Sequence, residues 1–317
     1  MTEKFRVLDY DIIYLSYDEP NAEKNYADLC KKIPWAKRVH GVKGSDAAHK
    51  ACAELSETDR FITIDGDNIV NTEFLSREFD LANHEDAHWN REVALKNCVI
   101  SWTAKNHING LMYGNGGIKC WPKKKVLEMR THEAADLDNP HAQVDFCWDL
   151  EYIQFNSCFS EIFNNATPQQ AWRAGFREGV KMCLNRGVKS SFDDFKDIHW
   201  RNLHRLYIWM MIGTDVENGI WAIYGARQGL VRTMLTDWDY INVRDFDWLN
   251  DFWKSQVRNV DPLIESIKIG KEILTNLELP ISETPLENNQ SKFFKEVYQN
   301  PSRFALVQNR KLHETNI

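Results

Sequence analysis

Residues 61–70 read FITIDGDNIV, an apolar run that ends in two aspartates one residue apart. An unbroken run of aromatic and β-branched residues is typical of a strand buried on both faces of a sheet. Two carboxylates at the end of such a strand cannot both lose their water without a compensating positive charge. The fold must therefore bring Asp65 and Asp67 either to solvent or to a cation.

Two strand–helix pairs are predicted ahead of this strand. Strands are expected at residues 10–17 and 37–42, and helices at 21–33 and 45–55. This alternation predicts an α/β fold, in which helices wrap a doubly wound, Rossmann-like parallel sheet. Such sheets bind ligands at the carboxyl ends of their strands. Ser16, Tyr17 and Lys43 are expected to lie at that edge together with the two aspartates.

The pattern changes towards the C-terminal half of the chain. Thr167 and Pro168 form an N-cap and first-turn pair for a helix, and residues 203–213 and 220–235 are further helical candidates. A length of 317 residues suits one large or two modest domains. We therefore predict a nucleotide-binding domain over residues 1–150 and a mainly helical region over 151–317.

Charge and cysteine usage narrow the class of protein. The net charge is -7, so any contact with nucleic acid needs a local basic patch. No run approaches the roughly 18 apolar residues of a membrane span, and the N-terminal residues lack an apolar leader. The seven cysteines are scattered and form no C-x-x-C motif, which is typical of reduced thiols. We expect a cytoplasmic protein with no membrane partner.

The D-x-D element of Asp65 and Asp67 permits several interpretations. Oxygen ligands of this kind suit Mg²⁺ or Mn²⁺. A solvated turn also uses Asp, Gly and Asn. An EF-hand is excluded, because Val70 and Ser76 stand where its glycine and glutamate belong. A phosphatase that forms an aspartyl-phosphate on Asp65 remains open, although its motif usually closes the first strand of the sheet.

Several segments together resemble a known family. In order, SYDEP, GVKGSDAAHKACAEL and RFITIDGDNIV resemble the nucleotide-binding half of GT-A glycosyltransferases with their D-x-D motif, over roughly residues 8–150. YGNGGIKCW, VDFCWD and IWAIYGARQG are further similar to phage-encoded glycosyltransferases, some of which add sugars to hydroxymethylated cytosine in DNA. If the chain is phage-encoded, its location would be the host cytoplasm.

The resemblance implies a nucleotide-sugar donor, most often a UDP-sugar, with Mn²⁺ or Mg²⁺ bridging its phosphates. Asp67 would bind the metal directly, and Asp65 would contact the donor ribose or a metal-bound water. Ser16 and Tyr17 would lie beside the base, and Lys43 and His49 would face the nucleotide. A late histidine often completes the metal site in this family. His199 is our candidate, and His107, His141 and His204 are alternatives.

An enzyme that inverts the anomeric configuration also needs a carboxylate base for the acceptor hydroxyl. Asp145 and Asp149 are the candidates, with Glu151 close behind. Asp145 stands between Val144 and Phe146, where loss of water could raise its pKa to a useful value. Each of these carboxylates could instead lie on a helix surface, and a retaining enzyme would not need the base.

A glycine-rich loop and one late arginine complete the candidates on the donor side. Asn115, Gly116 and Gly117 would present backbone N–H groups, and Lys119 a cation, close to the sugar or acceptor. The same residues could form a plain hairpin turn. Arg227 could reach the diphosphate or serve as a salt-bridged structural arginine.

A basic row is the candidate acceptor surface. Arg173, Arg177 and Lys181 recur every four residues and would share one helix face. Such a row could track DNA phosphates without reading sequence, or it could be a solvated face paired with nearby acids such as Glu178. A protein that binds a nucleotide sugar without transferring it is the remaining alternative.

Overall fold

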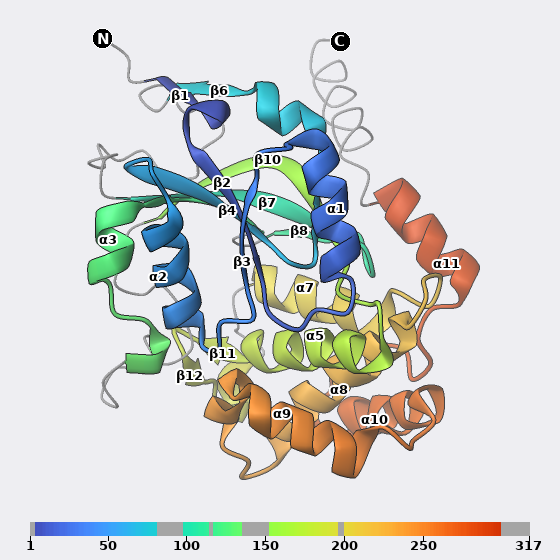
Figure 1. Cartoon of the computed structure of the whole chain (residues 1–317). Helices are drawn as coiled ribbons and strands as arrows, with labels where there is room; N and C mark the ends of the chain where they lie inside the picture. Colours follow the sequence, from blue (N-terminus) through green and yellow to red (C-terminus); the bar gives the residue numbers. More distant parts are fainter. Residues whose placement is uncertain (1–3, 81–97, 114–116, 135–151, 196–199, 299–317) are drawn as a thin grey trace, which may run out of the picture. The chain divides into compact units, whose positions relative to one another are not determined.

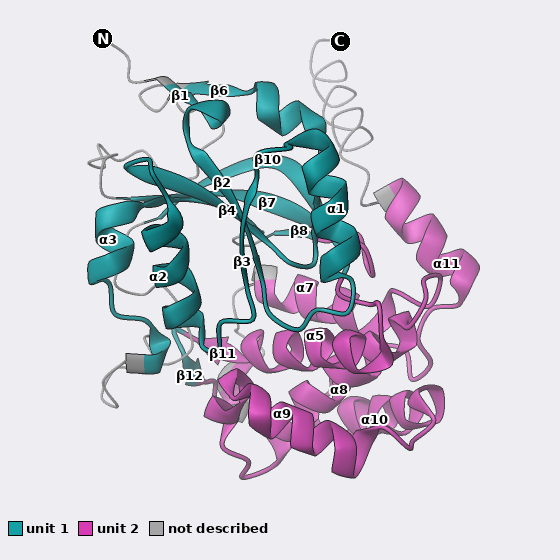
Figure 2. Cartoon of the chain, in the orientation of Figure 1, with its two compact units in different colours: residues 1–106, 112–163, 186–188 teal, residues 107–111, 164–185, 189–317 magenta. Residues whose placement is uncertain are grey.

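The computed structural model describes residues 4–80, 98–113, 117–134, 152–195 and 200–298. The chain is an α/β protein with a curled mixed sheet and many helices (Figure 1). It divides into two compact units (Figure 2). Unit 1 comprises residues 1–106, 112–163 and 186–188, and unit 2 comprises residues 107–111, 164–185 and 189–317.

Unit 1 is built on one large sheet with the strand order β3-β2-β4-β9-β7-β10-β5, and β8 pairs with β7. The parallel neighbours are β3 with β2, β2 with β4, and β7 with β10, whereas β9 runs antiparallel to both β4 and β7. The strands are β2 (Asp11–Ser16), β3 (Lys37–His40), β4 (Arg60–Asp65), β5 (Asn68–Val70), β7 (Val99–Asn106), β8 (Met112–Tyr113), β9 (Ile118–Pro122) and β10 (Tyr152–Ile162).

Helices connect and cover these strands. The longer ones are α1 (Ala22–Lys32), α2 (Ser45–Leu55) and α3 (Lys123–Glu128). Short 3-10 turns lie at η1 (Val7–Asp9), η2 (Thr72–Ser76) and η4 (His132–Ala134). The strands β1 (Lys4–Arg6) and β6 (Glu78–Asp80) form a separate antiparallel pair. The predicted order strand, helix, strand, helix, strand is confirmed over β2, α1, β3, α2 and β4.

The sheet is buried on both faces, as the unbroken apolar runs predict. Along β2, Ile12 and Tyr14 pack into one core cluster together with Leu29 of α1. Ile13 points to the opposite face and packs with Cys52 of α2 and Val126 of α3. Successive residues of a strand point to opposite faces, so each strand supplies both clusters.

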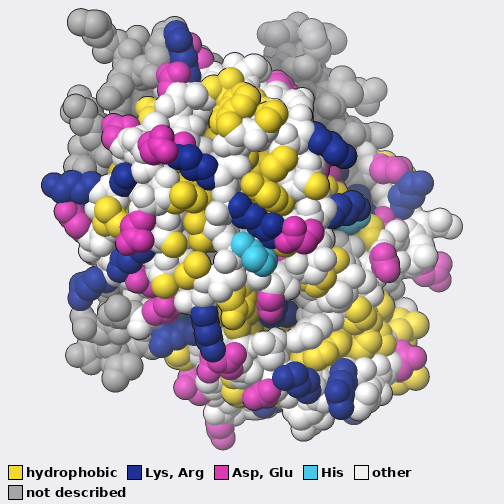
Figure 3. All heavy atoms as spheres, in the orientation of Figure 1, with side chains coloured by type: hydrophobic (Ala, Val, Ile, Leu, Met, Phe, Trp, Pro, Cys, Tyr) yellow, Lys and Arg dark blue, Asp and Glu magenta, His cyan; other side chains and the backbone are white. Residues whose placement is uncertain are grey.

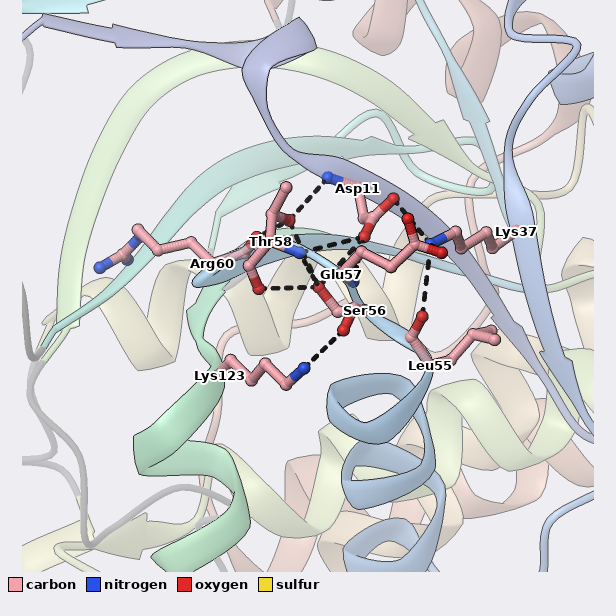
Figure 4. A network of polar contacts seen from close by, with 8 residues as sticks. All are labelled: Asp11, Lys37, Leu55, Ser56, Glu57, Thr58, Arg60 and Lys123. Carbon is pink, nitrogen blue, oxygen red and sulfur yellow. Dashed lines mark hydrogen bonds and ion pairs between the residues drawn. The ribbon is translucent and has the colours of Figure 1, made fainter.

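A polar network fixes the amino-terminal ends of β2 and β4 (Figure 4). The Asp11 carboxylate accepts hydrogen bonds from the Glu57 and Thr58 N–H groups and lies 3.0 Å from Lys37 Nζ. Burial alone would raise the pKa of Asp11, but the bonds from Glu57 and Lys37 outweigh it and the pKa is lowered. Lys123 Nζ donates to the Ser56 carbonyl. The network therefore ties the end of α2 to the sheet.

Two features differ from the sequence-based expectation. The predicted strand does end at Asp65, but after the turn at Gly66 and Asp67 a further strand, β5, was not predicted, and it pairs with β10. Residues 152–162 were assigned to the helical region but form β10, which pairs with β7 in unit 1. The division between the units accordingly falls after Phe163 and not at residue 150.

Unit 2 is mainly helical. Thr167 accepts a hydrogen bond from the Gln170 N–H, which confirms the predicted start of α5. The helices are α5 (Pro168–Lys181), α6 (Phe192–Phe195), α7 (Trp200–Met211), α8 (Gly219–Leu235), α9 (Phe246–Phe252), α10 (Pro262–Asn276) and α11 (Asn288–Phe293). A 3-10 turn lies at η5 (Tyr240–Arg244), and π-helical turns lie at η6 (Trp253–Val257) and η7 (Phe294–Tyr298). The short strand β11 (Leu184–Asn185) pairs with β12 (Val188–Lys189).

The helices α5 and α8 pack backbone against backbone. A Cβ atom on Gly175 or Gly179 of α5 would overlap the carbonyl oxygen of Ala222 or Ala226 on α8. Reciprocally, a Cβ on Gly225 or Gly229 of α8 would overlap a carbonyl oxygen of α5. The absence of side chains at these four positions is what allows the two helices to approach so closely. Among the described residues, no helix is both long and apolar enough to cross a membrane.

Candidate acidic site at the carboxyl end of β4

The expected edge of the sheet forms in unit 1. Because β2 pairs in parallel with β3 and β4, Ser16 lies opposite His40 and Leu15 lies opposite Asp65. The carboxyl ends of the three strands therefore meet, as such sheets require. Ser16 is buried, and Asp65 is half-buried at the last position of β4.

Hydrogen bonds to the Gly66 carbonyl oxygen anchor the turn between the two aspartates. This oxygen accepts hydrogen bonds from the Tyr14 hydroxyl at 2.6 Å and from Asn25 Nδ2 at 3.1 Å. A Cβ on Gly66 would lie 2.7 Å from a carboxylate oxygen of Glu19 and 3.0 Å from the Cβ of Ser16. A side chain at position 66 would therefore displace the Glu19 carboxylate and crowd Ser16.

Three carboxylates share this edge with little positive charge to balance them. Burial, followed by the charges of Asp65 and Glu19, raises the pKa of Asp67 to about 7. Burial is also the main cause that raises the pKa of Glu19, and the charge of Asp65 adds to it. The compensating cation is Lys119 of β9, whose Nζ lies 3.4 Å from Asp65 Oδ2.

This donor set fits a hard divalent cation, since every ligand atom it offers is a carboxylate oxygen. A bound cation would offset both causes of the raised pKa of Asp67, first its burial and then the neighbouring negative charges of Asp65 and Glu19. Across the residues that the structure describes, no three His, Cys, Asp or Glu side chains converge as a ready-made metal group. Among the described residues, Asp65 and Asp67 would therefore leave the remaining ligand positions of a cation to water or to a bound substrate, and the predicted ligand His199 lies outside those residues.

Two of the expected nucleotide contacts lie beside the acidic pair. Ser16 Oγ is 2.9 Å from His40 Nδ1 and accepts a bond from Arg38 Nε at 3.3 Å. Tyr17 is exposed, and its N–H donates to the Glu19 carboxylate at 2.8 Å. The side chain of Tyr17 is therefore available to a ligand, whereas Ser16 already belongs to a polar cluster.

The other two expected contacts come from the second α/β unit. Lys43 is exposed in the connection between β3 and α2. His49, on α2, places Nδ1 2.8 Å from the Ser45 carbonyl oxygen and its ring 5.0 Å from that of Trp121. Burial lowers the pKa of His49 to about 4. The charge of Asp65 opposes this shift, and the charge of Lys119 adds to it. His49 is thus a neutral side chain close to the acidic pair.

Several expected site residues cannot be placed. Asn115, Gly116, Asp145, Asp149 and His199 lie outside the described residues. Gly117, next to them, is described, and its carbonyl oxygen accepts a hydrogen bond from the Asp65 N–H at 2.9 Å. The start of β9 therefore supports the backbone of Asp65.

The basic row on α5 and Arg227 belong to unit 2. The guanidinium groups of Arg173 and Arg177 each lie 4.9 Å from the centre of the Phe246 ring. Lys181 is half-buried at the end of the same helix. The basic row on α5 therefore consists of two arginines that pack on the exposed ring of Phe246, followed by Lys181.

The expectation that Arg227 reaches the diphosphate needs correction. Its side chain is fully buried, and its three guanidinium nitrogens donate to the carbonyl oxygens of Met210, Ser266, Ser282 and Glu283. Burial lowers its pKa to about 10. Arg227 is a structural residue that joins α7, α8, α10 and the segment after α10.

Comparison with known proteins adds little. No protein-family model matches the chain, and no curated protein matches it. One solved structure that resembles it is titled "Crystal structure of HddC from Yersinia pseudotuberculosis", with 16% sequence identity over 47% of this chain and 69% of that chain. The TM-score is 0.24, and a likeness at that level carries no argument about fold or activity.

Three residues of the site escaped the sequence-based reasoning. Glu19 lies in SYDEP, directly after the first strand, and the rule that strand ends meet at one edge could have included it. Asn68 stands directly after Asp67 in the motif, but its role could not be seen there, because only the pairing of β5 with β10 brings Ser160 to it.

Proposed function

We propose that this chain is a metal-dependent glycosyltransferase that moves a sugar from a nucleoside-diphosphate sugar, with UDP-sugar as the first candidate, to a hydroxyl acceptor. The observation that carries the proposal is the cluster of Asp65, Asp67 and Glu19 at the carboxyl end of β4, with Lys119 beside Asp65. The resemblance of the N-terminal segments to GT-A enzymes supports the same reaction.

In this proposal, Asp65 and Asp67 hold Mn²⁺ or Mg²⁺. When bound, that cation would stabilise the charge of the departing diphosphate as a Lewis acid. Lys119, beside Asp65, supplies a fixed positive charge at the same edge. Tyr17 and Lys43 are exposed and contact the nucleotide. Asp145 or Asp149 remains the predicted base, and His199 the predicted third protein ligand.

The proposed acceptor is a hydroxyl group, with 5-hydroxymethylcytosine in phage DNA as the specific candidate. Its support is the row of Arg173, Arg177 and Lys181 on α5, with the ring of Phe246 under the two arginines. Cations in a row can position a polyanion through its phosphates, and an exposed ring can stack on a base.

A thermal-shift panel tests the donor half of the proposal. UDP, GDP, CDP and simple phosphate esters are each added with and without Mn²⁺ to the wild-type protein, to Asp67→Ala and to Asp18→Asn. Asp18→Asn is the control, since it removes an exposed carboxylate from the neighbouring loop. Binding to the folded state raises the melting temperature by mass action.

We expect one nucleoside diphosphate to stabilise the wild type and Asp18→Asn only when Mn²⁺ is present, and to leave Asp67→Ala unchanged. No shift with any nucleotide and metal would reject the glycosyltransferase. Release of UDP from a sugar donor then separates a transferase from a protein that only binds the nucleotide sugar.

An aspartyl-phosphate phosphatase is the second candidate, and one observation favours it. Asp65 is half-exposed, as a nucleophile must be, and the pKa of Asp67 near 7 suits a general acid. Asp65 Oδ would attack phosphorus, the ester oxygen would leave with the proton of Asp67, and water would then hydrolyse the acyl phosphate. This candidate predicts a beryllium fluoride adduct at Asp65 and hydrolysis of simple phosphate esters.

A further inference from the structure

We propose that Asn68 and Ser160 are positioning residues that hold the Asp67 carboxylate in the orientation in which it binds a divalent cation. The inference rests on the proposed metal-dependent function and extends it to two residues that do not touch the metal. Its basis is a buried chain of hydrogen bonds that begins on β10 and ends on Asp67.

The chain consists of two bonds between side chains. The Ser160 hydroxyl donates to Asn68 Oδ1 at 3.0 Å, and Asn68 Nδ2 donates to Asp67 Oδ1 at 2.8 Å. Asn68 is 2% exposed and Ser160 is 5% exposed. Water therefore has little access to the amide, and the bond that Asn68 makes to the carboxylate is not easily replaced.

The orientation of the Asn68 amide follows from its two neighbours. An ionised carboxylate only accepts hydrogen bonds, so the NH₂ end of the amide must face Asp67. That choice leaves Oδ1 towards Ser160, whose hydroxyl can donate to it. Without the hydroxyl, the amide oxygen would lose its partner, and the amide could rotate away from the carboxylate.

The backbone around Asp67 is fixed by the same strand. The Phe163 N–H donates to the Asp67 carbonyl oxygen at 2.7 Å. Directly beyond it, β5 pairs with β10 in a register that sets Val70 opposite Ser160 and Asn68 opposite Ile162. The strand β10 thus restrains both the main chain and the side chain of Asp67.

Packing against Gly117 restricts the Asn68 amide on one side. A Cβ on Gly117 would overlap the Asn68 amide, so the glycine backbone at the start of β9 lies directly against it. The same glycine accepts the hydrogen bond from the Asp65 N–H. Asn68 therefore fills the gap between β9 and β10 and connects the supports of both aspartates.

Such a support is needed because Asp67 faces like charges. The charges of Asp65 and Glu19 both act on Asp67, and repulsion would favour any rotamer that moves its carboxylate away from them. A donor fixed at 2.8 Å opposes that movement before the metal arrives. Residues that orient metal ligands in this way typically change metal affinity about 10- to 100-fold when they are removed.

The test measures the affinity of the full-length chain for Mn²⁺ alone, from the electron paramagnetic resonance signal of the free ion. The variants are Asp67→Ala, Asn68→Ala, Ser160→Ala and Ser160→Thr, and Thr103→Ala is the matched control. Thr103 is also a buried hydroxyl that donates to β10, at the Asn156 carbonyl, but it has no bond to the Asp67 chain. Melting temperatures are recorded for every variant.

We expect Asn68→Ala and Ser160→Ala to weaken Mn²⁺ binding about 10-fold. Ser160→Thr, which keeps the hydroxyl, should stay within about 2-fold of the wild type. Thr103→Ala should lower the melting temperature without changing the affinity. If Asn68→Ala does not fold, Ser160→Ala against Ser160→Thr decides the question.

The two possible failures are distinguishable. Wild-type Mn²⁺ affinity in both Asn68→Ala and Ser160→Ala would overturn the positioning role and leave the proposed function standing. A wild-type protein that binds no Mn²⁺, or an Asp67→Ala variant that binds it as tightly as the wild type, would overturn the metal site and this inference together.

Discussion

At the scale of single residues, the acidic site and Arg227 show opposite uses of a buried charge. Asp67 carries a charge that its surroundings oppose, since burial and two neighbouring carboxylates raise its pKa to about 7. Burial also opposes the charge of Arg227, whose pKa it lowers, but the guanidinium N–H groups are bonded to four carbonyl oxygens inside unit 2. An ionisable group with a strongly shifted pKa and like charges beside it is typical of a functional site. A charged group whose hydrogen-bond donors all have partners within the protein is typical of a structural role.

The raised pKa of Asp67 predicts an unusual pH dependence of stability. Between about pH 4 and pH 7, the folded state keeps a proton that the unfolded state has lost, so this group's contribution to stability falls as pH rises. In metal-free buffer, Asp67→Asn should therefore be more stable than the wild type at pH 8, by about 1–2 kcal/mol for a half-buried carboxyl group. The difference should vanish near pH 4.

Urea denaturation of both proteins from pH 4 to pH 8, with a chelator present, measures this dependence. Free energies of unfolding that differ by the same amount at every pH would contradict the raised pKa. Added Mn²⁺ should reverse the order at pH 8, because only the wild type retains the carboxylate.

Arg227 provides the contrasting test. Arg227→Met removes donors from four carbonyl oxygens, those of Met210 and Ser266 in buried bonds and those of Ser282 and Glu283 in part-buried ones, so we expect the free energy of unfolding to fall by about 3–5 kcal/mol. The exposed Arg258→Met is the control and should change it by less than about 0.5 kcal/mol. At a temperature where Arg227→Met is still folded, its affinity for UDP and Mn²⁺ should equal that of the wild type. A selective loss of nucleotide affinity would restore the diphosphate role.

At the scale of elements, the contact between α5 and α8 reverses the usual effect of a glycine substitution. Gly→Ala in the middle of a helix normally stabilises by about 1 kcal/mol through helix propensity. Here, Gly179→Ala should destabilise by about 1–3 kcal/mol, because the added methyl group meets the Ala226 carbonyl oxygen and the helices must separate.

Denaturation of Gly179→Ala beside Ala174→Gly checks this prediction. Ala174 is half-buried on the same helix, and its replacement should cost only the propensity term of about 1 kcal/mol. A Gly179→Ala protein as stable as the wild type would mean that the helices are not in backbone contact.

The elements also explain how far the sequence could predict the fold. The unit from β2 to β4 was predictable, because β2 and β4 are apolar runs and each helix has one apolar face. β10 was not, since register shifts between Phe155 and Cys158 and between Cys158 and Ser160 interrupt its alternation of buried and exposed side chains. Of the acidic site, the local motif from Asp65 to Asn68 was visible, while Glu19 and Ser160 are brought to it by strand pairing.

At the scale of the whole molecule, charge limits which acceptors are plausible. The net charge is -7, and on the face that Figure 3 shows, Lys and Arg side chains lie interspersed with Asp and Glu. No global field therefore draws DNA to the protein, and any binding must come from a local row of cations. The number of cations in that row therefore determines how steeply DNA affinity should fall with salt concentration.

Three phosphate contacts, from Arg173, Arg177 and Lys181, predict that the logarithm of the DNA association constant falls with the logarithm of salt concentration with a slope of about -3. Arg177→Glu should make the slope less negative by at least about 1 and lower affinity for hydroxymethylated duplex DNA. Fluorescence anisotropy at several salt concentrations measures both. An unchanged slope in Arg177→Glu would exclude this helix face as the acceptor surface.

The glycines of α5 and α8 have a consequence for anyone who surveys variation in this protein. At Gly175, Gly179, Gly225 and Gly229, even the smallest possible side chain meets main-chain atoms. A saturation library scored for survival would therefore show these positions as intolerant as Asp67, although they bind nothing. A search for catalytic residues based only on intolerance to substitution would therefore point to α5 and α8. Measuring the amount of folded protein separately from its activity would distinguish the glycines, which affect folding, from Asp67, which is proposed to affect activity.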